Sequence, residues 1–196
     1  MKIREAEIED YDSLLPLFRQ VHDLHVFERP DLYNENPIPV ERDFYLNQIA
    51  DSKQHVFVAY RGIDIYAFVV MREEEVPANT FVKARRILYV NSLCVAEEQR
   101  GNGIGKLMMR FVLDYGRKLN VDSVELGVSE SNRSAIQFYE AVGLKTKSRR
   151  MEYKLNKSNI LIGKWYKYYV KIKNVAERHK QFKQVDERTS NKVWKI

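Results

Sequence analysis

One short stretch of the chain carries three glycines at alternate positions, and it reads Arg100-Gly101-Asn102-Gly103-Ile104-Gly105-Lys106. An apolar run precedes this stretch at 87–95, and a segment with helical spacing follows it. We expect a strand that turns through the glycines into a helix. The first N–H groups of that helix have no partner within it, and its dipole is positive at that end. The stretch therefore predicts an anion site, for which phosphate is the usual ligand.

The spacing of the glycines separates three kinds of phosphate-binding loop. A P-loop needs four residues between Gly and Gly-Lys and then Ser or Thr, but three residues separate Gly101 from Gly105, and Leu107 follows the lysine. A dinucleotide fingerprint has the spacing Gly-x-Gly-x-x-Gly near the start of its fold, which this chain lacks. The pattern Arg-x-x-Gly-x-Gly is met by Arg100, Gly103 and Gly105. A plain turn with permissive glycines is the remaining alternative.

This pattern resembles the pyrophosphate-binding motif of the GCN5-related N-acetyltransferases. The resemblance covers roughly residues 1–155. A second segment supports it about 30 residues downstream: Asn132-x-x-Ala135-Ile136-x-Phe138-Tyr139-Glu140-x-x-Gly143-Leu144. It implies a single acetyltransferase domain with a mixed, splayed sheet flanked by helices, an α/β (α+β) fold. It also implies acetyl-CoA as the donor and an amine as the acceptor, with no metal.

The resemblance assigns donor-binding roles to particular residues. It implies that the Gly loop binds the pyrophosphate of acetyl-CoA through Arg100, Gly101, Asn102, Gly103, Ile104, Gly105 and Lys106. It further implies that backbone groups of Leu93, Cys94 and Val95 bond the pantetheine arm where two strands diverge, and that Asn132 touches the same arm. Asn132 also suits a helix N-cap, and Cys94 suits apolar packing better than catalysis.

Acetyl transfer to an amine needs an acid for the departing thiolate and a base for the amine. Tyr139 is the candidate acid, since a phenol with a pKa near 10 stays protonated at neutral pH and can donate to a thiolate. A core aromatic is the alternative, because its helix is otherwise apolar on one face. The base stays open. Some family members use a carboxylate on the strand that precedes the loop, but Asn91 and Ser92 occupy those positions here.

Several other groups remain candidates for the base: Glu28, Glu73, Glu125, a water chain, and His22 with His25. The acceptor is expected beside the segment from Phe27 to Tyr33, where a proline could fix a closing loop. A simple connecting loop is the alternative for this segment. The residue types and spacing do not select one acceptor among small molecules and proteins.

Hydrophobic periodicity predicts the elements that hold these residues, in the order β-α-α-β-β-β-α-β-α-β. Asp10 is expected to cap the first helix, 11–24. Two strand-like runs meet at a tight turn at Arg61-Gly62. The strands on either side of the Gly-loop helix should be parallel, because a crossover helix joins them. The last strand is expected at Leu144 to Leu155.

Charge divides the 196-residue chain unevenly. Residues 157–196 hold 11 Lys and Arg against 3 Asp and Glu, a net charge of +8, whereas residues 1–156 carry −2. We expect an acetyltransferase domain at 1–156 and a basic, aromatic, helical extension at 157–196. Nucleic acid or ribosome binding is expected only through this extension, and homodimer formation stays open. Acyl-CoA binding without turnover is a further alternative.

Composition also bounds the setting of the protein. A single cysteine rules out an internal disulfide framework and a cysteine-rich zinc site. No apolar run approaches the length of a membrane span, and the N-terminal residues lack the apolar core of a signal peptide. A cytoplasmic location is the expectation.

Overall fold

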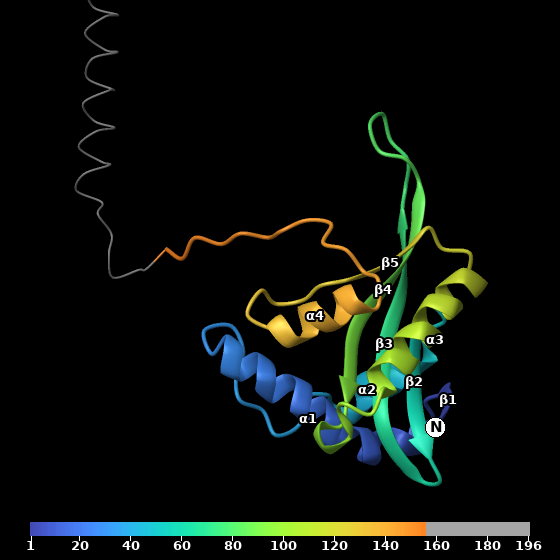
Figure 1. Ribbon diagram of the computed structural model, residues 1–196, viewed down its shortest axis with the longest axis vertical. Helices are drawn as coiled ribbons and strands as arrows, with labels where there is room; N and C mark the ends of the chain where they lie inside the picture. Colours follow the sequence, from blue (N-terminus) through green and yellow to red (C-terminus); the bar gives the residue numbers. More distant parts are fainter. Residues whose placement is uncertain (156–196) are drawn as a thin grey trace, which may run out of the picture. The chain divides into compact units, whose positions relative to one another are not determined.

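A computed structural model describes residues 1–155, and the chain divides into two compact units, Met1–Lys145 and Thr146–Ile196. All helices and strands of the described residues lie in the first unit (Figure 1). They are β1 (Lys2–Glu5), a 3-10 turn η1 (Ile8–Asp10), α1 (Tyr11–Glu28), α2 (Arg42–Ala50), β2 (Gln54–Arg61), β3 (Asp64–Val76), β4 (Arg85–Val95), a 3-10 turn η2 (Glu97–Gln99), α3 (Ile104–Lys118), β5 (Ser123–Leu126) and α4 (Arg133–Ala141). None of the helices in this range is long and apolar enough to cross a membrane.

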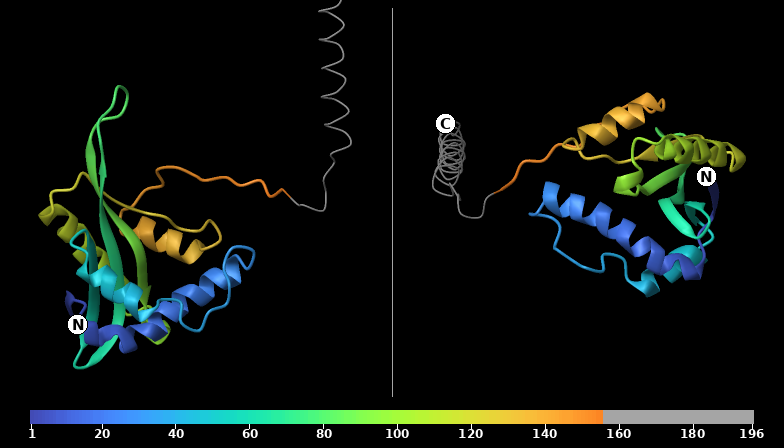
Figure 2. Two further views of the ribbon diagram at one scale, coloured as in Figure 1. Left: turned by 180° about the vertical axis from the view of Figure 1, so that it is seen from behind. Right: turned by 60° about the horizontal axis from the view of Figure 1, so that its bottom comes forward.

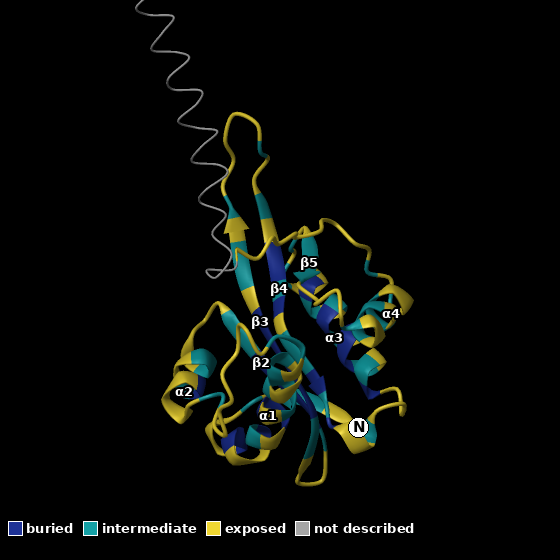
Figure 3. Ribbon diagram, turned by 90° about the vertical axis from the view of Figure 1, so that its left-hand side faces the viewer, coloured by how far each residue is buried: buried dark blue, intermediate teal, exposed yellow. Residues whose placement is uncertain are grey.

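The five strands form one mixed sheet in the order β1-β2-β3-β4-β5. The first four pair antiparallel, and β4 and β5 pair parallel with α3 as the crossover between them. Helices α1 and α2 cover one face of the sheet, and α3 and α4 cover the other (Figure 3). The predicted mixed sheet flanked by helices is confirmed, as are the tight β2–β3 turn and the parallel pair.

Each face of the sheet carries its own apolar core. On the α1 side, Phe18 meets Phe68 of β3 edge to face, with ring centroids 4.8 Å apart. On the α3 side, Phe57 of β2 meets Phe111 at 4.6 Å. Burial of side chains this large is the main favourable term in folding. The sheet between the two cores is therefore a rigid base for the loops at its ends.

A bulge and a divergence shape the end of β4. Val70 of β3 pairs with Ser92, and the next residue of β3, Met71, pairs with Val90, so Asn91 is the extra residue on β4. The parallel register with β5 ends at Val90 and Leu126, whereas β4 continues beside β3 to Val95. A bulge bends its strand and commonly lies next to a functional site. The last five residues of β4 thus have β3 as a neighbour but not β5, which is the predicted splay.

Two predictions about local structure are wrong. No strand forms at 144–155, where Met151, Tyr153 and Leu155 are 84–88% exposed. Their alternation suggested a strand, but a strand also needs a paired neighbour. No strand ladder includes residues 146–155 in the described part of the chain. Leu144 instead follows the C-terminus of α4, where its N–H donates to Tyr139 O of the last turn. The expected helix at 157–196 lies outside the described residues.

Asp10 does not cap α1 with its side chain. Its carboxylate is buried and accepts two bonds from the Arg4 guanidinium, at 2.6 and 2.8 Å, and one from the Glu7 N–H at 2.8 Å. The bonds from Arg4 hold the pKa of Asp10 below its usual value. Asp10 therefore ties the start of α1 to β1, a contact between two elements that a capping pattern does not reveal.

Candidate active site

The predicted strand, loop and helix follow one another as expected. Strand β4 ends at Val95, η2 follows, and α3 begins at Ile104 with Gly103 as its N-cap. Gly101 and Gly103 have φ angles of 80° and 79°, a left-handed conformation that costs a residue with a Cβ about 1–2 kcal/mol. The loop therefore depends on glycine at these two positions for its shape.

Gly105 is needed for a different reason, which is close packing. A Cβ on this residue would lie 3.2 Å from two ring atoms of Phe138. The ring of Phe138, on α4, thus rests on the first turn of α3. This contact brings together the two segments that carried the family resemblance, although about 30 residues separate them in the chain.

The first turn of α3 presents its N–H groups beside an open cavity. The first helical bond runs from Leu107 N to Gly103 O at 3.0 Å, so the four preceding amides, 103–106, are those that an α-helix leaves without internal partners. A cavity of about 490 Å³ adjoins the loop, lined by Met1, Arg61, Gln99, Asn102, Gly103, Ile104 and Leu107. The glycines, the start of the helix and the adjoining cavity together fit a ligand that carries phosphate.

The residues at the end of β4 divide between the two faces of the sheet. Cys94 is buried on the α1 side, and Leu93 and Val95 pack on the α3 side. Burial raises the pKa of the Cys94 thiol to about 12, so it stays protonated and is a poor nucleophile. Its interpretation as a packing residue is confirmed. Arg100 lies back over the strand, with Nε 3.4 Å from Val95 O.

Two side chains of α4 were singled out in the sequence. Asn132 is the N-cap of this helix, and its Oδ1 accepts from the Ala135 N–H at 3.1 Å. Tyr139 packs against Phe138, with ring centroids 5.3 Å apart. Burial raises the pKa of Tyr139 above its usual value of 10. Its hydroxyl forms no hydrogen bond with any residue of 1–155, so it is a protonated donor without a protein acceptor.

Most candidates for the base are already engaged. His55 and Arg86 bond to Glu73 at 3.0 and 2.9 Å, and these contacts lower the pKa of Glu73. Arg85 pairs with Glu125 at 3.2 Å. A carboxylate held by a cation is a weaker base.

The two histidines of α1 are also engaged. His22 Nε2 lies 2.8 Å from Asn34 O. His25 stacks on Tyr33.

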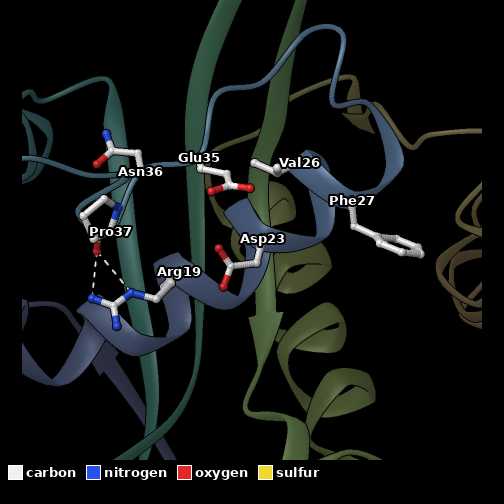
Figure 4. Close-up of a pocket in the computed structure, with 7 residues that line it drawn as sticks. All are labelled: Arg19, Asp23, Val26, Phe27, Glu35, Asn36 and Pro37. Carbon is white, nitrogen blue, oxygen red and sulfur yellow. Dashed lines mark hydrogen bonds between the residues drawn. The ribbon is translucent and has the colours of Figure 1, made fainter.

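A second cavity lies between the C-terminal half of α1 and the loop that returns to α2. It has a volume of about 690 Å³ and is lined by Arg19, Asp23, Val26, Phe27, Glu35, Asn36 and Pro37 (Figure 4). Phe27 is 85% exposed, and it belongs to the last turn of α1 rather than to a loop. Asp23 and Glu35 carry no motif, so the sequence did not identify them.

The comparisons with known proteins agree with this geometry. The model of the acetyltransferase (GNAT) family matches residues 18–144. The chain belongs to this family. It is 23% identical to the N-acetyltransferase YhfO of Bacillus subtilis over 80% of this chain and 97% of that protein. It is 30% identical to an N-acetyltransferase of Methanocaldococcus jannaschii, but that match spans only 34% of this chain and 29% of the other protein.

Solved structures give the same fold. A mutant protein of Bacillus halodurans is 32% identical, with a TM-score of 0.77 over 80% of this chain and all of that one. An aminoglycoside N-acetyltransferase crystallised with CoA is 14% identical and shares the fold alone, with a TM-score of 0.58 over 79% of this chain and 99% of that one. A GNAT member is an acyltransferase, and this chain is one on the strength of the family match. The family relationship also makes acetyl-CoA the expected donor.

Proposed function

We propose that this GNAT protein moves the acetyl group of acetyl-CoA to an amine by direct attack. The observation that supports this most is the order of parts at the end of β4. The strand outruns β5 from Asn91 onward, and a left-handed glycine loop then opens α3. Helix α4, which carries Tyr139, packs on the first turn of α3 through Phe138.

The donor would be held mainly by backbone. The loop 100–106 would receive the phosphates at the N-terminus of α3, where N–H groups and the helix dipole favour negative charge. The free stretch of β4, including Leu93, Cys94 and Val95, would bond the amides of the pantetheine arm. Asn132 fixes the start of α4 beside this arm. The bound thioester supplies an activated acetyl group, and the protein orients it.

Tyr139 would donate a proton to the leaving sulfur. Its hydroxyl has no acceptor among residues 1–155, and burial keeps it protonated. An acid in this state is ready at neutral pH without a change of ionisation. The alternative, a purely packing role, predicts that loss of the hydroxyl leaves turnover unchanged.

The acceptor would enter at the cavity beside α1. Asp23 on the helix and Glu35 on the returning loop come from the two elements that border it (Figure 4). The one cation of the lining, Arg19, already donates to Pro37 O at 2.7 and 3.1 Å. Two carboxylates favour a positively charged partner, so we propose an amine that carries a second cationic group.

A transfer assay tests the proposed function. The full chain is incubated with acetyl-CoA and a panel of monoamines, diamines, aminoglycosides, amino acids and lysine peptides, and products are read by mass spectrometry. An added acetyl group on at least one amine is expected, with dicationic amines preferred over neutral analogues. CoA binding without transfer to any class of amine would contradict it and would favour the binding-only alternative. Binding of nucleic acid by residues 157–196 concerns residues outside those described and stays a separate hypothesis.

A further inference from the structure

The side chain of Gln20 joins helix α1 to the segment that leads into the Gly loop. Gln20 Nε2 lies 2.9 Å from Val95 O and 2.9 Å from Cys94 Sγ, so one amide group spans both residues. Its Oε1 accepts from the Glu97 N–H at 2.9 Å. Both N–H donors of the amide are thereby used, together with one of the two lone pairs of its oxygen.

These three bonds act where the sheet supports β4 on one side only, through its pairing with β3, which the bond from the Ala96 N–H to Tyr66 O at 2.8 Å continues. Beyond Val90, β4 has no pairing with β5, and the chain leaves the sheet after Val95. Val95 O also receives Nε of Arg100, at a longer 3.4 Å. Gln20 thus holds the carbonyl that the loop arginine approaches and the first amide of η2. A displacement of α1 would therefore displace both the Val95 carbonyl and the Glu97 amide.

We propose that Gln20 is a positioning residue, which sets the donor loop from the acceptor side of the molecule through the end of β4. The position of α1 supports this proposal. Helix α1 also carries Asp23 and Phe27, which line the second cavity, on the face of the sheet opposite α4 (Figure 2). An acceptor that moves α1 would therefore change how the loop holds the donor.

The inference rests on the proposed role of the loop in binding the donor, but one of the two measurements that test it does not depend on that role. Cys94 is the only cysteine of the chain, and it is buried under Gln20. Its alkylation rate reports whether α1 stays on β4, with or without acetyl-CoA. Affinity for acetyl-CoA, measured by calorimetry, reports whether the loop keeps its position.

Three variants test separately the bond that Gln20 accepts from Glu97 and the bonds that it donates to Val95 and Cys94. Gln20→Met keeps the length and loses all three bonds, Gln20→Glu keeps the acceptor toward Glu97, and Gln20→Lys keeps a donor toward Val95. We expect Gln20→Met to weaken acetyl-CoA binding about tenfold and to speed alkylation by a similar factor, as loss of three hydrogen bonds, two of them partly buried, implies. The Lys variant should fall between it and wild type, whereas the Glu variant, which turns a carboxylate oxygen toward the acceptors Val95 O and Cys94 Sγ, should weaken binding at least as much as Gln20→Met. Gln48→Met on α2, which removes a single bond to Gln54 of β2, should change neither readout.

The outcomes are distinct. Weaker binding and faster alkylation in the Gln20 variants alone support the positioning role of Gln20. If the Met variant does not fold, the Glu and Lys variants decide. Wild-type alkylation and unchanged affinity in folded variants overturn it. A merely structural role lowers the melting temperature but leaves affinity unchanged well below it, which also overturns the inference. If wild type does not bind acetyl-CoA, the proposed function fails, and alkylation still decides whether Gln20 holds α1 to β4.

Discussion

The proposed donor site and the proposed acceptor site are built in different ways. The loop 100–106 starts from a buried strand and opens a helix whose inner face is buried, and its shape depends on two left-handed glycines. The cavity beside α1 is lined mostly by exposed side chains, of which Phe27 is 85% exposed. One site uses backbone held by a core, and the other uses side chains on a surface.

This difference separates what the two sites can recognise. Backbone amides and a helix dipole bind a constant chemical group, so the same pattern serves any protein that takes the same donor. Side chains on a loop can change without loss of the fold, and they set specificity. Variants on the donor side should therefore affect all acceptors alike, and variants on the acceptor side should discriminate among them.

The largest effect is expected at Tyr139. Replacement by Phe removes the proton donor and should lower kcat about tenfold or more for every acceptor, with acetyl-CoA affinity little changed. Because its pKa is raised by burial, the protonated form is lost only as the pH rises through this raised value. Any fall in rate from this group should therefore begin at a higher pH than for an ordinary tyrosine.

Tyr115→Phe is the matched control for Tyr139. Tyr115 lies on α3, and its hydroxyl bonds to His55 Nδ1 at 3.1 Å, outside the proposed site. Its loss should lower stability and leave kcat as it is. Equal kcat values for wild type and Tyr139→Phe would reduce Tyr139 to a packing residue.

The next effect is expected at Gly103. Alanine at its φ of 79° costs about 1–2 kcal/mol, which shifts the loop away from its shape and should weaken acetyl-CoA binding about tenfold. Gly62→Ala places the same residue at a φ of 62° in the β2–β3 turn. It should lower the melting temperature without weakening binding. Equal losses of affinity in the two variants would argue against a role of the loop in donor binding.

A smaller and selective effect is expected at the acceptor cavity. The double variant Asp23→Asn, Glu35→Gln should raise KM for a dicationic amine about threefold, because exposed charge pairs contribute little. KM for acetyl-CoA and for a neutral monoamine should not change. Asp12→Asn, at the other end of α1 and paired with Arg42, is the control. A rise in KM that is equal for all acceptors would contradict the proposed difference between the donor side and the acceptor side.

The smallest effect on catalysis is expected at Asp10, whose side chain links the start of α1 to β1. Its folded-state pKa is lowered, so its contribution to stability is present above the unfolded value near 3.9 and is lost as the pH falls through the folded value. Asp10→Asn should lower stability by about 1–3 kcal/mol at pH 7, with kinetic constants unchanged. In thermal scans from pH 7 to pH 2, the gap between variant and wild type should close below pH 4.

The sequence predicted the donor side better than the rest, for physical reasons. Glycines at fixed spacing and Asn132 at a helix start are local signals, and local backbone geometry confirms both. Asp10 was assigned a local cap, but its partner Arg4 lies on another element. The linkage from Gln20 spans more than 70 residues and has no sequence pattern. Alternation at 151–155 predicted a strand, since a pattern shows a preference but not a partner.

The central claim is that the loop 100–106 is a donor site for acetyl-CoA. A calorimetric titration of the full chain with acetyl-CoA, run in parallel on Gly103→Ala and Gly62→Ala, tests it most directly. The account predicts one acetyl-CoA bound per chain, weakened about tenfold in Gly103→Ala and unchanged in Gly62→Ala. No binding to folded wild type, or equal binding to all three proteins, would contradict it.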